Sequence, residues 1–99
     1  MKKILLIDDE STFRDTMGML LRHHGYEVMD APDGLAGVRM ARNNRPDLVI
    51  SDIVMEPVDG FMTLSILRQQ PDTATVPFVL ITGHQELDRA RKGLVLGAD

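Results

Sequence analysis

Four oxygen-bearing side chains stand where apolar runs of this sequence end. Asp8 and Asp9 follow the first run, Asp52 ends the third, and Thr82 ends the fourth. The carboxyl ends of parallel strands meet at one edge of a sheet, where ligands bind. Each residue alone has an ordinary explanation, since aspartate stops strands and caps helices and threonine suits a strand. Two adjacent acids at the same edge as a third exceed what capping needs, so we expect one polar site.

Three carboxylates that share a site repel one another. Two like charges about 5 Å apart repel by roughly 3 kcal/mol at an effective dielectric constant near 20. Either protons or a cation must offset this repulsion. Oxygen ligands without His or Cys suit a hard divalent ion, and Mg²⁺ fits best because it binds few carboxylates and completes its shell with water and phosphate oxygens. The sequence therefore predicts Mg²⁺ at Asp8, Asp9 and Asp52.

The elements that would carry these residues alternate between strand and helix. Runs that are apolar at consecutive positions predict buried strands, and apolar stripes at helical spacing predict helices. We expect strands at 3–7, 26–30, 48–52 and 77–82, and helices at 11–24, 35–44, 60–70 and 85–96. This order, βαβαβαβα, predicts an α/β fold in which a parallel sheet with right-handed crossovers has helices on both faces. The apolar stripe that should face the sheet comprises Phe13, Met17, Leu20, Leu21 and His24 in the first helix, and Leu35, Val38 and Ala41 in the second.

Composition limits the classes of protein to consider. The 99 residues fit one domain, and the net charge of −4 offers no basic surface for nucleic acid. The absence of cysteine excludes disulfides and thiolate metal sites. No apolar run is long enough to span a membrane, and the first residues lack a signal-peptide pattern. We expect a cytoplasmic protein without membrane or direct nucleic-acid contacts.

Together, these segments resemble the receiver domain of two-component response regulators. The matching segments follow one another at the right spacing along the whole chain: Ile7-Asp8-Asp9-Glu10, Asp52-Ile53-Val54-Met55 with Asp59-Gly60, Ile81-Thr82-Gly83, and Gly97-Ala98-Asp99. Each segment alone is weak evidence, but the ordered set is specific. The resemblance implies a flavodoxin-like, doubly wound parallel sheet with strand order 2-1-3-4-5.

The resemblance also implies a role for each site residue. Asp52 would accept a phosphoryl group from the phosphohistidine of a sensor histidine kinase or a phosphotransfer protein. Asp9 and Asp52 would bind Mg²⁺ through their side chains, Val54 through its carbonyl, and Asp8 largely through a bound water. Thr82 would be the switch hydroxyl, and the last strand and helix offer a face for a homodimer. Such a domain is a signalling phosphoacceptor, not an enzyme, although it assists its own phosphorylation and dephosphorylation.

The sequence departs from the family pattern at two places. Glu56 stands where the family usually has proline, with Pro57 after it, which adds an acid beside the site and alters the rigidity of the loop. The family also has an essential lysine on a fifth strand, and none of the lysines of this chain can replace it. We therefore expect residues 1–99 to be an incomplete receiver domain that lacks the fifth strand and fifth helix. A monomer ending at Asp99 should be close to unfolded, or should borrow cover from another chain.

Two other classes of function use similar residues. A haloacid-dehalogenase-type phosphatase also has a strand-end aspartate and Mg²⁺, but it needs a second aspartate where this chain has Val54. A pseudo-receiver that binds partners without taking phosphate is consistent with the absent lysine but not with the complete set of acids. Labelling by acetyl phosphate that depends on Asp52 but not on Asp59 would separate the three. We also expect His84, two residues after Thr82, to block the attacking water and slow dephosphorylation.

Overall fold

The computed structural model describes residues 2–81, and the structural statements that follow concern this part of the chain. Strands and helices alternate in the order β1 (Lys3–Ile7), α1 (Ser11–His23), β2 (Glu27–Ala31), α2 (Gly34–Asn44), β3 (Leu48–Asp52), α3 (Gly60–Arg68) and β4 (Phe78–Ile81). The strands form one parallel sheet in the order β2-β1-β3-β4. The predicted α/β architecture is confirmed. The predicted helix at 85–96 lies outside the described residues.

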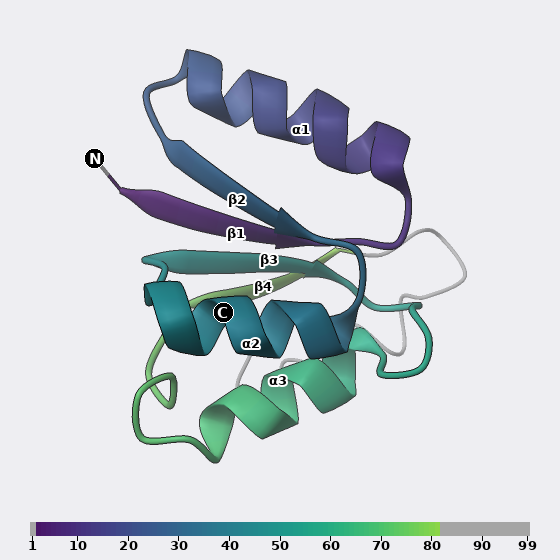
Figure 1. Ribbon diagram of the computed structural model, residues 1–99, viewed down its shortest axis with the longest axis vertical. Helices are drawn as coiled ribbons and strands as arrows, with labels where there is room; N and C mark the ends of the chain where they lie inside the picture. Colours follow the sequence, from purple (N-terminus) through teal and green to yellow (C-terminus); the bar gives the residue numbers. More distant parts are fainter. Residues whose placement is uncertain (1, 82–99) are drawn as a thin grey trace.

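The order of the strands decides which face each helix covers. The chain steps from β1 to β2 on one side and then returns across β1 to β3. Since crossovers between parallel strands are right-handed, opposite steps place α1 and α2 on opposite faces of the sheet. Figure 1 shows α1 on one side of the sheet and α2 with α3 on the other.

The main hydrophobic core lies under α2 and α3. It includes Leu5 and Ile7 of β1, Val49 of β3, Leu64 of α3 and Phe78 of β4, none more than 1% exposed. A Cβ on Gly37 would overlap the side chain of Ile7, so glycine at this position lets α2 lie close to β1. The predicted inward side of α2 is wrong for Leu35, which is 44% exposed.

The hydrogen bonds that cap the helices show whether capping explains the acidic residues Asp8 and Asp9. Asp33 caps α2 by accepting a hydrogen bond from the amide of Ala36, and Asp59 caps α3 by accepting one from Met62, both at 2.8 Å. The N-cap of α1 is Glu10, and no side chain caps that helix. Capping of α1 therefore does not explain why Asp8 and Asp9 are acidic.

Candidate functional site

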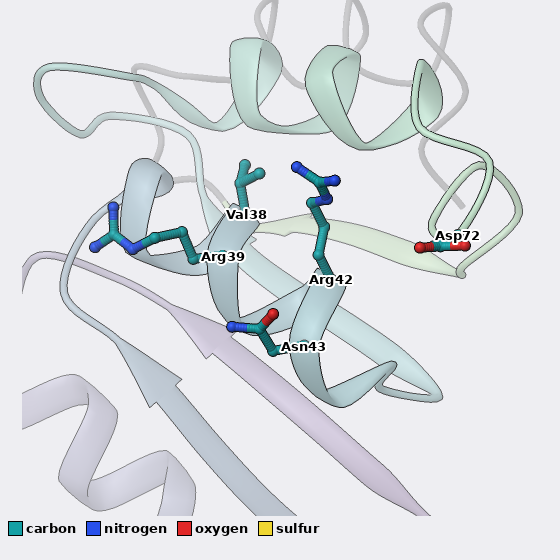
Figure 2. Close-up of a pocket in the computed structure, with 5 residues that line it drawn as sticks. All are labelled: Val38, Arg39, Arg42, Asn43 and Asp72. Carbon is teal, nitrogen blue, oxygen red and sulfur yellow. The ribbon is translucent and has the colours of Figure 1, made fainter.

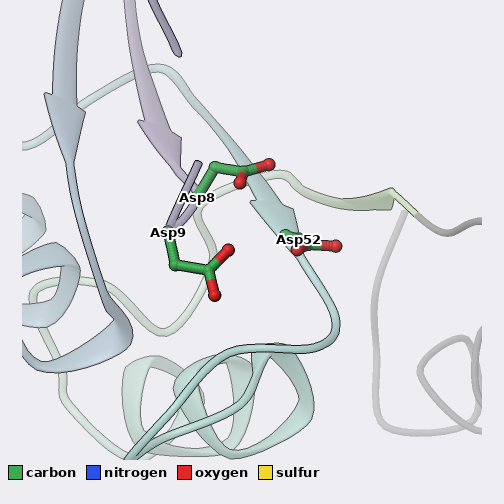
Figure 3. A group of neighbouring side chains, drawn as sticks. All are labelled: Asp8, Asp9 and Asp52. Carbon is green, nitrogen blue, oxygen red and sulfur yellow. The ribbon is translucent and has the colours of Figure 1, made fainter. Parts of the chain in front are cut away.

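The register of the sheet places Asp8 beside Asp52. Ile7 of β1 pairs with Ser51 of β3, so the next residue along each strand extends the same pairing. Paired residues of neighbouring parallel strands point to the same face, and the strands lie about 4.8 Å apart. One carboxylate oxygen from each of Asp8, Asp9 and Asp52 lies within 4.8 Å of the others. Figure 3 shows the three side chains gathered at the ends of β1 and β3.

Asp8 is held by hydrogen bonds at its amide, at its carbonyl and at one carboxylate oxygen. It is 7% exposed, and its amide donates to the carbonyl oxygen of Ala31 at 3.1 Å, which continues the pairing of β1 with β2. Its Oδ1 accepts from the amide of Glu10 at 2.9 Å. Its carbonyl oxygen accepts from Nη1 of Arg14 at 2.6 Å. The first acid of the cluster is therefore fixed in place by β2 and by α1.

Asp52 stands at the end of β3 among backbone groups. Its Oδ1 accepts from the amide of Ile53 at 2.9 Å. The amide of Gly60 donates to the carbonyl of Ile53 at 2.8 Å, which ties the start of α3 back to this strand end. A Cβ on Gly60 would overlap the carbonyl oxygen of Asp52 and come within 2.9 Å of the Cα of Ile53. Glycine at position 60 therefore lets the start of α3 lie against the end of β3. In the loop between these elements, the peptide bond between Glu56 and Pro57 is cis.

The electrostatics of the cluster disfavour three negative charges. Burial raises the pKa of Asp8, and the charge of Asp9 raises it further, against the opposing hydrogen bond from Glu10. Burial raises the pKa of Asp52, and the charge of Asp8 adds to this, whereas hydrogen bonds from the amides of Ile53 and Val54 lower it. Both carboxylates therefore gain from a nearby cation. A donor set made only of carboxylates fits a hard divalent ion such as Mg²⁺.

The structure tests the other predicted site residues only in part. The side chain of Val54 is exposed in the loop after β3, and the role of its carbonyl stays a prediction. Thr82 and His84 lie outside the described residues. The sequence interpretation missed Arg14, whose guanidinium contacts the backbone of Asp8. Its only sequence signal is an arginine in the first turn of the helix that follows the acids.

A cavity of about 380 Å³ lies away from the acids, between α2 and the segment after α3. Its lining comprises Val38, Arg39, Arg42, Asn43 and Asp72. In Figure 2 the side chains of Arg39 and Arg42 diverge, so they do not converge on one point where a ligand could be held. The size of a cavity therefore does not identify the functional site of this molecule, whereas the cluster of Asp8, Asp9 and Asp52 does.

Known proteins identify the family. The family model of the response regulator receiver domain matches residues 4–99. The chain belongs to that family. This receiver domain is 36% identical over 90 residues to the protein PilH of Pseudomonas aeruginosa, covering 90% of this chain and 74% of PilH. It is 34% identical over 99 residues to the DNA-binding dual master transcriptional regulator RpaA of Synechocystis sp., covering all of this chain and 41% of RpaA.

Solved structures agree with the fold. The chemotaxis protein CheY4 of Vibrio cholerae superposes with a TM-score of 0.91 at 31% identity, covering 99% of this chain and 82% of that one. A response regulator receiver domain from Clostridium thermocellum gives a TM-score of 0.92 at 34% identity, covering 99% and 78%. The predicted family and flavodoxin-like receiver fold are therefore confirmed, and the phosphatase alternative is not favoured.

The lengths of the relatives differ from that of this receiver domain. It spans 41% of RpaA and 37% of a probable transcriptional regulator ycf27 of Galdieria sulphuraria. The activities and partners of such longer regulators are therefore not carried over as findings. Among residues 2–81, no helix has the length and apolar character needed to cross a membrane.

Proposed function

We propose that this receiver domain accepts a phosphoryl group on Asp52, with Mg²⁺ held by Asp8, Asp9 and Asp52. The observation that carries the proposal is the meeting of these three carboxylates within 4.8 Å at the carboxyl edge of the sheet. Membership of the receiver family supports it. The donor would be the phosphohistidine of a sensor histidine kinase or of a phosphotransfer protein, and the domain would act in the cytoplasm as a signalling component.

A comparison of the surroundings of Asp8 and Asp52 favours Asp52 as the acceptor. Asp8 is buried and already accepts a hydrogen bond from Glu10, so a phosphohistidine could not reach it readily. Asp52 is half-buried, and its carboxylate faces the amides of Ile53 and Val54. These donors can stabilise negative charge on the acyl phosphate that forms. Asp52 is therefore the carboxylate whose surroundings can both admit a phosphoryl group and compensate its charge.

The transfer joins a carboxylate oxygen of Asp52 to phosphorus as the bond from phosphorus to the imidazole nitrogen breaks. Asp8, Asp9 and Asp52 would hold Mg²⁺, with the carbonyl of Val54 as a further ligand. Bound Mg²⁺ would supply positive charge for the equatorial phosphoryl oxygens. The phosphoryl group adds about −1.5 to −2 charge at neutral pH. In response to this charge, Thr82 would turn toward the phosphoryl oxygens. This movement would shift the equilibrium between two packed conformations of the domain.

Labelling by acetyl phosphate in Mg²⁺ tests the proposal. The wild-type protein should gain one phosphoryl group by intact mass, EDTA should prevent it, and Asp52→Asn should abolish it. Asp59→Asn is the matched control, because asparagine caps a helix as well as aspartate does, and it should be labelled normally. A pseudo-receiver would bind Mg²⁺ or fold normally without being labelled. Labelling that survives Asp52→Asn would show that the acceptor is another residue.

A further inference from the structure

Arg14 connects the acid cluster to two elements that do not belong to it. From the first turn of α1, its Nη1 donates to the carbonyl oxygen of Asp8 at 2.6 Å. Its Nε donates to Oδ2 of Asp30 on β2 at 3.1 Å, and this ion pair leaves only 16% of the Arg14 side chain exposed. One planar guanidinium therefore reaches the end of β1 and the neighbouring strand at the same time.

The carbonyl group of Asp8 lies where the backbone leaves β1 and continues to Asp9. β1 ends at Ile7, and the amide of Asp8 still donates to β2, at Ala31. Its carbonyl is bound by the side chain of Arg14. That carbonyl belongs to the peptide that joins Asp8 to Asp9, so its orientation fixes where the backbone of Asp9 lies relative to that of Asp8. A charge-assisted hydrogen bond is stronger and shorter than a neutral one and suits this purpose.

A second arginine on the same helix provides an internal comparison. Arg22 also reaches from α1 to β2, where its Nη2 donates to the carbonyl oxygen of Val28 at 3.3 Å. Arg22 is exposed and lies two turns farther along the helix, away from the acids. Both arginines connect α1 to β2, but Arg14 also binds the backbone of Asp8, which belongs to the acid cluster.

We infer that Arg14 is a positioning residue, which holds the peptide between Asp8 and Asp9 so that both carboxylates stay opposite Asp52. This inference rests on the proposed function of the acid cluster. It requires the fork of arginine, because lysine carries one compact ammonium and cannot keep two separated acceptors in the same geometry. Arg14 acts through the two acids and has no contact of its own with the transferred group.

Mg²⁺ affinity separates positioning from a simple effect of charge. If Arg14 acted only through its positive charge, Arg14→Gln would bind Mg²⁺ more tightly, because a repelling cation is removed, and Arg14→Lys would be unchanged. Positioning predicts the opposite sign. By isothermal titration calorimetry, we expect Arg14→Gln to bind Mg²⁺ about tenfold more weakly and Arg14→Lys about three- to fivefold more weakly. Labelling by acetyl phosphate should slow in parallel in both variants.

Arg22→Gln is the matched control and should keep the Mg²⁺ affinity of the wild type within about twofold. Urea unfolding and amide NMR spectra establish that each variant is folded, and amide shifts confined to residues 8–10 before Mg²⁺ is added would support the inference. If Arg14→Gln does not fold, Arg14→Lys decides alone, because its charge is unchanged. Affinity equal to or tighter than that of the wild type in Arg14→Lys overturns the inference. A wild-type protein that binds no Mg²⁺ and takes no phosphate instead overturns the proposed function.

Discussion

The two faces of the sheet differ in how completely their apolar side chains are buried. Under α2 and α3, the side chains of Leu5, Val49 and Phe78 are completely buried. On the face that carries α1, Ile4 and Leu6 of β1 are also buried, but Leu48 and Ile50 of β3 are only half-buried, and they help to line a groove of about 330 Å³. The outer side of α1 is apolar as well, with Met19 70% exposed and Leu20 51% exposed. The predicted inward stripe of α1 is therefore wrong for Leu20.

The difference follows from the number of helices on each face within residues 2–81. A helix with its side chains is about 10 Å wide, and strands lie about 4.8 Å apart, so one helix covers about two strands. Two helices cover the four strands on one face, whereas α1 covers mainly β2 and β1 on the other. Burial, and with it stabilising free energy, is therefore concentrated on the face under α2 and α3.

The largest expected contrast comes from the same substitution on each face. Leu64 of α3 is completely buried, and Leu64→Ala should lower the free energy of unfolding by about 3 kcal/mol through lost burial and the cavity left behind. Leu21 of α1 is half-buried beside the groove, and Leu21→Ala should lower it by about 1 kcal/mol. Urea unfolding curves measure both. Equal losses would contradict the comparison of the faces.

Two helix glycines should respond with opposite signs. Gly37→Ala places a methyl group against the side chain of Ile7, and such overpacking costs about 1–3 kcal/mol. Gly18→Ala on α1 would come within 3.3 Å of the end of the flexible Arg22 side chain and would lie at an ordinary contact distance of 3.7 Å from Val28. There the better helix propensity of alanine should stabilise the protein by about 0.5 kcal/mol. Thermal unfolding of the two variants gives the sign of each change, and destabilisation by Gly18→Ala would show that α1 also packs tightly.

The acid cluster lies at the edge shared by both faces, and removing one of its negative charges should stabilise the folded state. The folded pKa of Asp52 lies above its unfolded value of about 3.9, so the folded state binds more protons between these values and stability falls as pH rises through them. Without Mg²⁺, Asp52→Asn should therefore stabilise the protein near pH 7. The gain should shrink as pH falls through the folded pKa and should be lost below the unfolded pKa of about 3.9, where the wild-type carboxyl is protonated in both states.

Urea unfolding in EDTA, repeated across this pH range, checks the effect. Asp47→Asn is not a suitable control, because Asp47 accepts a hydrogen bond from the amide of Lys3 at 2.7 Å. Asp15→Asn, on the exposed surface of α1, is suitable and should leave the pH dependence nearly unchanged. A gain from Asp52→Asn that grows as pH falls would have the wrong sign for a raised pKa.

The smallest expected effect belongs to the surface ion pair between Arg45 and Asp72. Nη2 of Arg45 lies 3.6 Å from Oδ1 of Asp72, and both side chains are more than half exposed. Such pairs are screened by solvent and contribute about 0.5 kcal/mol or less. Asp72→Ala should therefore shift the urea midpoint by little more than experimental error. A loss approaching that of Leu64→Ala would mean that this edge of the α2 face is stabilised by charge.

Several features of this protein follow from local sequence alone. Consecutive apolar residues before Asp8 and Asp52 indicate buried strands, and turn residues such as Gly25 and Gly34 separate them from the helices. Alternation of strand and helix then requires a parallel sheet, whose carboxyl edge collects the acids. These patterns are local because burial and backbone conformation repeat with the period of each element. The predicted strand and helix positions within residues 2–81 therefore agree with the structure to within one or two residues.

Other features depend on contacts between residues far apart in the chain. Pairing of Ile7 with Ser51 brings Asp8 beside Asp52, and no local pattern states a register. The inward side of α2 passes through Gly34, Gly37 and Ala41 instead of Leu35, because close approach to β1 favours small residues over large ones. Arg14 joins Asp8 to Asp30 only after α1 has folded back along the sheet. Tertiary structure decides these features because each requires two surfaces to meet, and a sequence pattern describes only one surface at a time.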